Sequence, residues 1–388
     1  MLASLCVFAV AAIAYVIFGF SWQGAAGRPA HVLTISGVAW NWVAAEPLFL
    51  RGLRLDLSHP SLVLLLEMFS VGLAAMIPLG AGAERWRLGA ACASTILLAG
   101  WTYPLFAHWA WSDGWLSQLG STYGLGQGFL DGSGAGTIQV MGGLSALSIA
   151  WILGPRRGKY SSEGGPAAIP AHNVVLVLAG CLLAWVGWLG LNSAGAILFN
   201  HREPSAVVLI AVNTTLSAAA AGLASAVVTR FRFGRPDASL VANGWMAGLV
   251  ASSASAAFLK PATAILGGAV AGALVVLAID LLEFRLTIDD PGGAISVHSL
   301  AGFWGLLSVA LLSDAGGGSR GQWLAQLIGI ATLVGLILPL THGLNWLIDH
   351  VYPHRIDEDA EWQGMDLHEL GAGAYPEFVV HSDEFTPR

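Results

Sequence analysis

Charged residues and cysteines are both scarce in this 388-residue chain. Asp, Glu, Lys and Arg together make up 11% of it, whereas an ordinary soluble protein carries about 25%. The hydrophobic fraction is 55% and the mean hydropathy is +0.68, which excludes a soluble globular enzyme and a disordered chain. Cys6, Cys92 and Cys181 are scattered through apolar runs, so they form neither a disulfide framework nor a CxxC metal site. The composition predicts a polytopic membrane protein.

Basic residues are few as well. The 17 Lys and Arg residues and the formal net charge of −7 argue against a nucleic-acid partner, because such binding needs basic patches that displace counterions. No serine–histidine or metal-ligand cluster has a convincing spacing. We therefore expect no enzymatic activity, no metal and no cofactor.

Apolar runs that are long enough to cross a bilayer, roughly 17–25 residues each, recur about ten times. They are continuously apolar rather than alternating, which favours helices over a β-barrel. We predict an all-α polytopic membrane protein whose spans cover residues 2–20, 61–82, 88–108, 136–154, 173–192, 206–228, 239–257, 262–283, 294–312 and 323–347.

Lys and Arg are unevenly divided between the two sides of these spans. Eleven lie on one side, among them Arg156, and six on the other, among them Lys260. The positive-inside rule places the larger group and both termini in the cytoplasm. Residues 1–350 are expected to form the transmembrane domain. The acidic segment 351–388 is expected to be a cytoplasmic tail, either solvated or docked on the bundle as a short regulatory helix.

Two glycine-rich segments 159 positions apart resemble each other. Asp131 precedes Gln139 by eight residues, and Asp290 precedes His298 by the same spacing. The segments begin the fourth and ninth predicted spans, which are five places apart, so the two helices are expected to run in opposite directions. This is typical of inverted repeats, whose shared interface carries a transport site near the midplane. Gln139 and His298 are therefore candidate site residues.

Other polar residues fall inside the spans, where each is costly unless it is paired or faces a cavity. Helix–helix hydrogen bonds are the simplest explanation for amides such as Asn192 and Asn213. Asp280 lies beside Arg285 near a span end, so we expect an interfacial ion pair there. Glu67 is a candidate by its position alone.

A series of short motifs follows in order along nearly the whole chain. They are Ala83-Glu84-Arg85, His108-Trp109-Ala110-Trp111, Asp131-Gly132-Ser133-Gly134, Gly187-Trp188-Leu189-Gly190-Leu191-Asn192, Asn213-Thr214-Thr215, Ile288-Asp289-Asp290-Pro291, Val297-His298 and the tail segment Gly364-Met365-Asp366-Leu367-His368-Glu369-Leu370-Gly371. In this order they resemble the Amt/Rh ammonium transporter family, most closely its bacterial Amt branch.

The resemblance implies a homotrimer of inverted-repeat bundles, each protomer with its own narrow, hydrophobic pore for ammonium or ammonia. In the family, an outer vestibule attracts ammonium by cation–π contact, and Trp111 and Asp131 match its recruitment residues. Trp188 matches a pore-lining tryptophan, and Phe69 fits the outer gate with a one-place shift. His298 matches the second of two facing histidines at the pore centre.

Three positions depart from the family pattern. Gln139 stands at the first histidine position. An imidazole can take and give a proton near neutral pH and a carboxamide cannot, so proton coupling is expected to be altered. Leu191 stands where the family has the inner gate phenylalanine, and Gly195 stands where it has the vestibule serine.

The first span matches the family's second helix through Phe18-Gly19-Phe20-Ser21. Either the reading frame starts late or this lineage has lost a helix. The resemblance also implies an integral protein of the bacterial inner membrane with a cytoplasmic C-terminus, and a PII-type regulatory protein as a partner of the tail and basic loops.

Three functions are compatible with these residues. The leading hypothesis is ammonium/ammonia transport through a hydrophobic pore in each protomer, with proton coupling altered by Gln139. The second is a non-conducting ammonium sensor or degenerate family member, because Gln139, Leu191 and Gly195 all lie where the family does its transport chemistry. The third is a pore for another small neutral molecule, since leucine makes the gate less aromatic.

Overall fold

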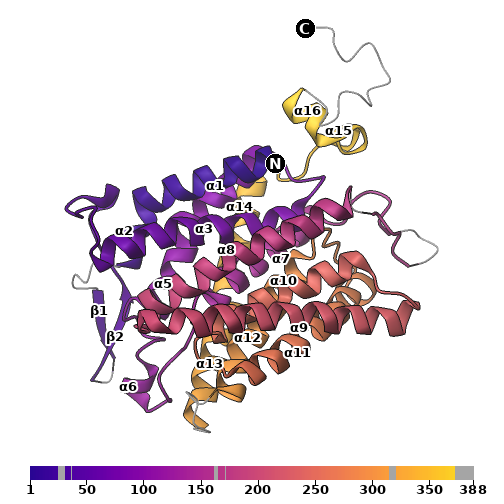
Figure 1. Ribbon diagram of the computed structural model, residues 1–388. Coiled ribbons are helices and arrows are strands. Elements are labelled where there is room, and N and C mark those ends of the chain that lie inside the picture. Colours follow the sequence, from indigo (N-terminus) through magenta and orange to yellow (C-terminus); the bar gives the residue numbers. More distant parts are fainter. Residues whose placement is uncertain (25–30, 36, 161–164, 171, 314–319, 372–388) are drawn as a thin grey trace.

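The chain folds into a bundle of long helices in the computed structural model, which describes residues 1–24, 31–35, 37–160, 165–170, 172–313 and 320–371 (Figure 1). Within these residues, nine helical segments are long and apolar enough to span a membrane. The all-α polytopic class predicted from the sequence is confirmed.

The elements follow the predicted spans, with several short π-helical turns inserted into the longer helices. In chain order the bundle consists of α1 (Leu2–Ala14), η1 (Tyr15–Gly19), α2 (Phe20–Gln23), α3 (His59–Gly82), α4 (Leu88–Leu97), η3 (Leu98–Thr102), α5 (Tyr103–Trp111), η4 (Ala135–Val140), α7 (Met141–Leu153), α8 (Val174–Asn200), α9 (Val207–Phe233), α10 (Ala238–Ser255), α11 (Pro261–Asp280), η6 (Leu281–Arg285), η7 (Ile295–Leu300), α12 (Ala301–Leu312), α13 (Arg320–Thr332), η9 (Leu333–Ile337) and α14 (Leu338–Val351). Short elements at the ends of the bundle are β1 (His31–Ile35), β2 (Val38–Val43), η2 (Leu48–Leu50), α6 (Leu119–Tyr123), η5 (Pro204–Ala206), α15 (Glu358–Gln363) and α16 (Met365–Leu370).

Helix α10 (Ala238–Ser255) is the seventh predicted span, 239–257, although it is not among the nine apolar segments found in the described residues. It packs against α8, α9, α11 and α12, so it needs little apolar surface for lipid. Its glycines let the neighbouring backbone approach closely. A Cβ on Gly248 would lie 2.5 Å from the carbonyl oxygen of Ser217 in α9, which is the small-residue packing common between membrane helices.

A β-hairpin between the first two spans was missed by the all-α prediction. Strands β1 and β2 pair antiparallel, with Leu33 opposite Trp40, and Gly37 has a positive φ of 79° beside the turn. The ring of Trp40 lies 5.6 Å from that of Trp115, between α5 and α6. Asn41 Nδ2 donates to the carbonyl oxygen of Asp113, just after α5, at 2.8 Å. These contacts fix the hairpin over one end of the bundle.

The N-terminus, α15 and α16 lie at the opposite end of the bundle from the hairpin (Figure 1). The chain after α14 is held there by backbone bonds: Arg87 N–H donates to the His354 carbonyl at 2.9 Å, and Ile356 N–H donates to the Arg85 carbonyl at 3.0 Å. The first part of the predicted tail therefore docks on the bundle. Its last residues, 372–388, lie outside the described part of the chain.

Candidate functional site

Gln139 and His298 face each other where the two repeats cross. Nδ1 of His298 lies 2.7 Å from Oε1 of Gln139. An amide oxygen only accepts hydrogen bonds, so Nδ1 donates and Nε2 of the neutral ring is left as an acceptor. Gln139 is completely buried, and its Nε2 has no hydrogen-bond partner among the described residues. Within the described residues, the pair thus leaves the amide N–H groups of Gln139 as donors and Nε2 of His298 as an acceptor, with no hydrogen bond to another protein group.

The helices that carry this pair are built in the same way. Oδ2 of Asp131 accepts from the N–H groups of Gly136 and Thr137 at 3.0 and 2.8 Å and from the Thr137 hydroxyl at 2.9 Å. Oδ2 of Asp290 accepts from the N–H groups five and six residues further on, at 2.9 and 3.2 Å. Each Asp satisfies N–H groups that the first helical turn leaves without a partner. The repeat seen in the sequence is therefore a repeat of structure.

The two helices run antiparallel and in close contact. The turn η4 lies against α12, and η7 lies against α7. A Cβ on Gly143 would lie 2.3 Å from the Ser299 hydroxyl oxygen, and a Cβ on Gly302 would lie 2.6 Å from Cγ2 of Val140. These glycines occupy the same place in each repeat, four residues after the paired polar side chain. Their lack of side chains allows Gln139 and His298 to meet.

Trp111 and Asp131 lie together at the hairpin end. Nε1 of Trp111 donates to the carbonyl oxygen of Asp131 at 2.8 Å. The Trp111 ring is stacked on Phe199 of α8, with centroids 4.0 Å apart and planes 1° from parallel. Phe199 was not predicted from the sequence, because no spacing along the chain connects it with Trp111.

Trp188 and Leu191 lie on α8, one turn apart. Nε1 of Trp188 donates to the Ser253 hydroxyl at 2.8 Å. Both side chains belong to an apolar cluster that includes Val297, next to His298 in the chain. Leu191 also contacts the larger apolar cluster around α3 and α7. The structure thus brings both predicted gate residues of α8 close to the second repeat.

The space expected for a vestibule serine is filled from another segment. A Cβ on Gly195 would lie 2.8 Å from Oγ of Ser133, within the Asp131–Gly134 turn. Ser133 is buried, and its hydroxyl donates to the Asn192 carbonyl at 2.9 Å. A hydroxyl is therefore present beside position 195, although residue 195 does not carry it.

Phe69 is not brought together with the other predicted pore residues. It is 57% exposed, and its ring centroid lies 6.1 Å from that of Phe8 on α1. The neighbouring Ser70 is completely buried and faces the interior of the bundle. The helical period therefore turns Phe69 outward, which corrects the expectation that it lines the outer gate.

Glu67 sits in a buried hydrogen-bonded network. Its carboxylate accepts from Nε2 of Gln23 at 2.8 Å and from the hydroxyl of Tyr103 at 2.5 Å. The Tyr15 hydroxyl donates to Oε1 of Gln23 at 2.7 Å. Because four side chains from η1, α2, α3 and α5 satisfy one another, we assign Glu67 to helix–helix packing. Asp280, by contrast, pairs with Arg232 of α9 rather than with the predicted Arg285.

The end opposite the hairpin carries a buried ion network. Asp289 accepts three bonds from Arg156, one from its backbone N–H and two from its guanidinium, at 2.9–3.1 Å. Nη1 of Arg85 lies 3.7 Å from the same carboxylate. Burial alone would raise the pKa of Asp289, but the bonds and charge of Arg156 hold it below its ordinary value. The network fixes the loop that precedes Asp290.

The docked tail closes over this network. The guanidinium of Arg355 donates to the carbonyl oxygens of Leu153 and Pro155 at 2.7 and 3.0 Å, and to Glu361 at 2.9 Å. The side chain of Glu369 accepts from the Leu88 N–H at 3.0 Å. Helices α15 and α16 are thereby tied to the ends of both α7 and α4.

Fold and site together define a polytopic membrane protein with an inverted repeat around a buried polar centre, the arrangement of membrane channels and transporters. The sequence model of the Ammonium Transporter Family matches residues 1–375. The chain belongs to this family.

Several transporters and solved structures are similar to this chain. Ammonium transporter Amt2 of Archaeoglobus fulgidus is 33% identical over 99% of the chain and 82% of its own length. An ammonium transporter of Bacillus subtilis is 29% identical over 95% of this chain and 87% of its own length. The solved structure of a protein named Sensor Amt Protein matches with a TM-score of 0.85 and 28% identity, covering 95% of this chain and 89% of that one. Mep2 of Saccharomyces cerevisiae shares the fold, with a TM-score of 0.76 and 24% identity. That match covers 92% of this chain and 80% of the Mep2 chain.

Proposed function

We propose that this protein transports ammonium/ammonia across the membrane through a pore that passes between Gln139 and His298. The observation that carries the proposal is the bond between these two side chains at the crossing of antiparallel repeats. Family membership and the relatives named ammonium transporters support the substrate. The free Nε2 donor of Gln139 and the free Nε2 acceptor of His298 suit ammonia, which both donates and accepts hydrogen bonds.

Ammonium is recruited at the hairpin end by Trp111 and Asp131. The indole face supplies cation–π attraction, and its stacking on Phe199 and its bond to the Asp131 carbonyl hold the ring in place. Ser133 supplies the hydroxyl that position 195 lacks. Trp188 and Leu191 then form the apolar constriction through which only the neutral molecule passes.

Gln139 cuts the proton relay that two facing imidazoles would provide. A carboxamide keeps the hydrogen bond to His298 but does not titrate near neutral pH. The proton given up before entry therefore stays on the outer side, and ammonia crosses without it. Transport is then driven by the ammonia gradient and moves no net charge.

The assembly proposed is a homotrimer in the bacterial inner membrane, with the tail in the cytoplasm. The outer side chains of helix α8 are apolar and exposed, for example Val175 at 68% exposure and Leu183 at 74%. They offer a surface for contact between protomers of the trimer. The basic residues gathered beside the docked tail support the cytoplasmic orientation. A PII-type regulatory protein is proposed as a partner of the tail and its neighbouring basic loops.

The experiment that tests transport is ammonium uptake by an uptake-deficient host that expresses this chain, with purified protein in liposomes as the second readout. Ammonium-dependent growth and internal alkalinisation are expected. Well-folded protein in the membrane with no ammonium-dependent flux would refute the proposal.

A non-conducting sensor is the second candidate function, favoured by Gln139 and by the likeness to Sensor Amt Protein. The two functions differ in one measurable respect. A sensor binds ammonium without flux, and Gln139→His would then be needed to obtain any flux. A transporter conducts without that substitution.

A further inference from the structure

The ring of Phe199 covers one face of the Trp111 indole. The two ring centroids are 4.0 Å apart and the planes are 1° from parallel, so no atom fits between them. A cation that binds an aromatic ring lies over its face, within about 6 Å of the centroid. Non-bonded heavy atoms approach to about 3.5–4.0 Å, so an ammonium ion in contact with both rings would need them about 7 Å apart. The indole face toward Phe199 is therefore closed to ammonium while the rings are stacked.

The other contacts of Trp111 fix its position. Nε1 of the indole donates to the Asp131 carbonyl oxygen at 2.8 Å, which sets the orientation of the ring. The side chain also packs against the larger apolar cluster of the bundle. Both Trp111 and Phe199 are only partly buried, so the stack lies at the edge of that cluster. The bonded edge and the apolar packing leave the face under Phe199 as the surface that a moving side chain can uncover.

The backbone that carries Phe199 is held on both sides of it. Nε2 of His59, at the start of α3, donates to the Leu198 carbonyl oxygen at 2.9 Å. Nδ2 of Asn200 donates to the Gly132 carbonyl oxygen at 2.6 Å, in the turn that precedes η4. Aromatic residues in helices populate χ1 of about 180° and about −60°, which gives Phe199 a second position. With the backbone held, the ring can leave the indole by rotation about its own χ1.

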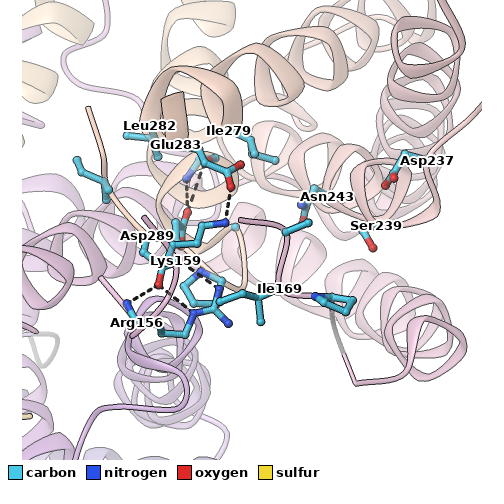
Figure 2. A pocket seen from close by; sticks show the side chains of 17 residues that line it. Arg156, Lys159, Ile169, Asp237, Ser239, Asn243, Ile279, Leu282, Glu283 and Asp289 are labelled. Carbon is cyan, nitrogen blue, oxygen red and sulfur yellow. Dashed lines mark hydrogen bonds and ion pairs between the residues drawn. The ribbon is translucent and has the colours of Figure 1, made fainter. Parts of the chain in front are cut away.

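The opposite end of the bundle is built differently. A cavity of about 310 Å³ lies there, and none of its described lining residues is aromatic. Figure 2 shows charged side chains on its walls instead, with Arg156 bonded to Asp289 and Lys159 bonded to Glu283. Of these two places, only the hairpin end carries a stacked pair of rings. The stack can therefore act only on cations that arrive from the hairpin side.

We infer that Phe199 is a specificity-determining residue, an aromatic lid that ammonium must displace from Trp111 and that disfavours larger organic ammonium ions. The inference rests on the proposed function, because it concerns how a cation reaches the proposed recruitment site. Ammonium gains a contact with the indole in exchange for the stacking that it breaks. An alkylated ammonium ion is wider, so it needs the lid to move further over the same fixed backbone.

A lid and a simple support for the indole predict opposite effects of removing the ring. If Phe199 is a lid, Phe199→Ala removes a competitor of ammonium, and the half-saturating ammonium concentration for flux should fall about threefold to tenfold. If Phe199 only holds Trp111 in place, that concentration rises instead. A rise or no change would overturn the inference. Phe231→Ala is the matched control, because that phenylalanine is 87% exposed on α9 and its loss should change the concentration by less than about twofold.

Tetramethylammonium tests the discrimination against larger cations, because quaternary ammonium ions bind open aromatic faces. In oriented liposomes, it should inhibit ammonium flux through Phe199→Ala at a concentration about tenfold lower than the wild type requires. The inhibition should come from the hairpin side, where Trp111 lies. Equal inhibition of the two proteins, or inhibition of the variant from the α15 side, would contradict a lid over Trp111.

The movement of the ring can be observed directly with 4-fluorophenylalanine incorporated at position 199 of the full chain. The indole ring current shifts the fluorine signal of a stacked ring, and ammonium should move that signal toward the value of an unstacked ring. The same label at position 231 is the control site, and sodium at the same concentration is the control cation. A signal at position 199 that saturating ammonium leaves unchanged would overturn the inference.

The outcomes separate the lid from the function on which it rests. An ammonium-dependent fluorine shift in a protein without flux would uphold the lid and refute transport. Flux with no fluorine shift, and with a half-saturating concentration that Phe199→Ala raises, would uphold transport and refute the lid. If Phe199→Ala failed to fold, the fluorine measurement alone would decide, because the labelled ring keeps the packing of phenylalanine.

Discussion

Replacing Gln139 by leucine tests whether the pore centre depends on its polar pair. Leucine fills a similar space but removes the acceptor 2.7 Å from Nδ1 of His298 and the free amide donor beside it. A buried donor left without a partner costs about 1–3 kcal/mol. If the ammonia molecule that crosses the pore loses a hydrogen bond worth this energy in the transition state for its passage, flux falls about 5-fold to 150-fold.

The assay is stopped-flow alkalinisation of liposomes after an ammonium jump, at equal protein per vesicle. Ser145→Ala is the control, because among the described residues its hydroxyl bonds only to the Met141 carbonyl within the same helix. Loss of that hydroxyl should leave flux within about twofold of wild type. Size-exclusion profiles and melting temperatures establish that both variants fold. Wild-type flux through folded Gln139→Leu would refute the role assigned to the pair.

Three further changes follow from the same structure. Phe69→Ala should leave ammonium flux within about twofold of wild type, because the ring is 57% exposed. A loss of flux of about tenfold in the liposome assay would show that Phe69 belongs to the outer gate after all. Gly195→Ala should lower the free energy of unfolding by about 1–3 kcal/mol, since its Cβ would lie 2.8 Å from Ser133; an unchanged melting temperature would contradict this overpacking. Asp289→Asn should cost about 3–5 kcal/mol at pH 7 by breaking the buried pair with Arg156. The pKa of Asp289 is lower in the folded protein than in the unfolded chain. The carboxylate therefore stabilises the fold above the unfolded pKa of about 3.9, and this stabilisation is lost as the pH falls through the lower folded pKa. The melting temperatures of variant and wild type should converge at acidic pH, and a difference that stays constant with pH would contradict this.

The sequence predicted the spans well because a continuous apolar run of sufficient length has few alternatives to a membrane helix. It also located α10, although a run of serine and alanine lowers the hydropathy of that span. The hairpin was missed, although Val38, Trp40 and Trp42 alternate with other residues after Gly37. Those strands are short and lie outside the apolar runs that guided the prediction.

The repeat made the Gln139–His298 pair predictable, since equal spacing from an Asp implies equal positions on two helices. Contacts between segments without such a relation could not be foreseen. The stacking of Phe199 on Trp111 and the hydroxyl of Ser133 beside Gly195 both depend on how α8 crosses the first repeat. Phe69 was misplaced because a shift of one residue on a helix turns a side chain by about 100°.

The most direct test of the account measures ammonium flux and charge movement on the same proteoliposomes of the wild-type protein. Because Gln139 does not relay a proton past His298, we predict rapid internal alkalinisation with no sustained current on a solid-supported membrane. Absence of alkalinisation, or a current equal to one positive charge for each nitrogen moved, would contradict it.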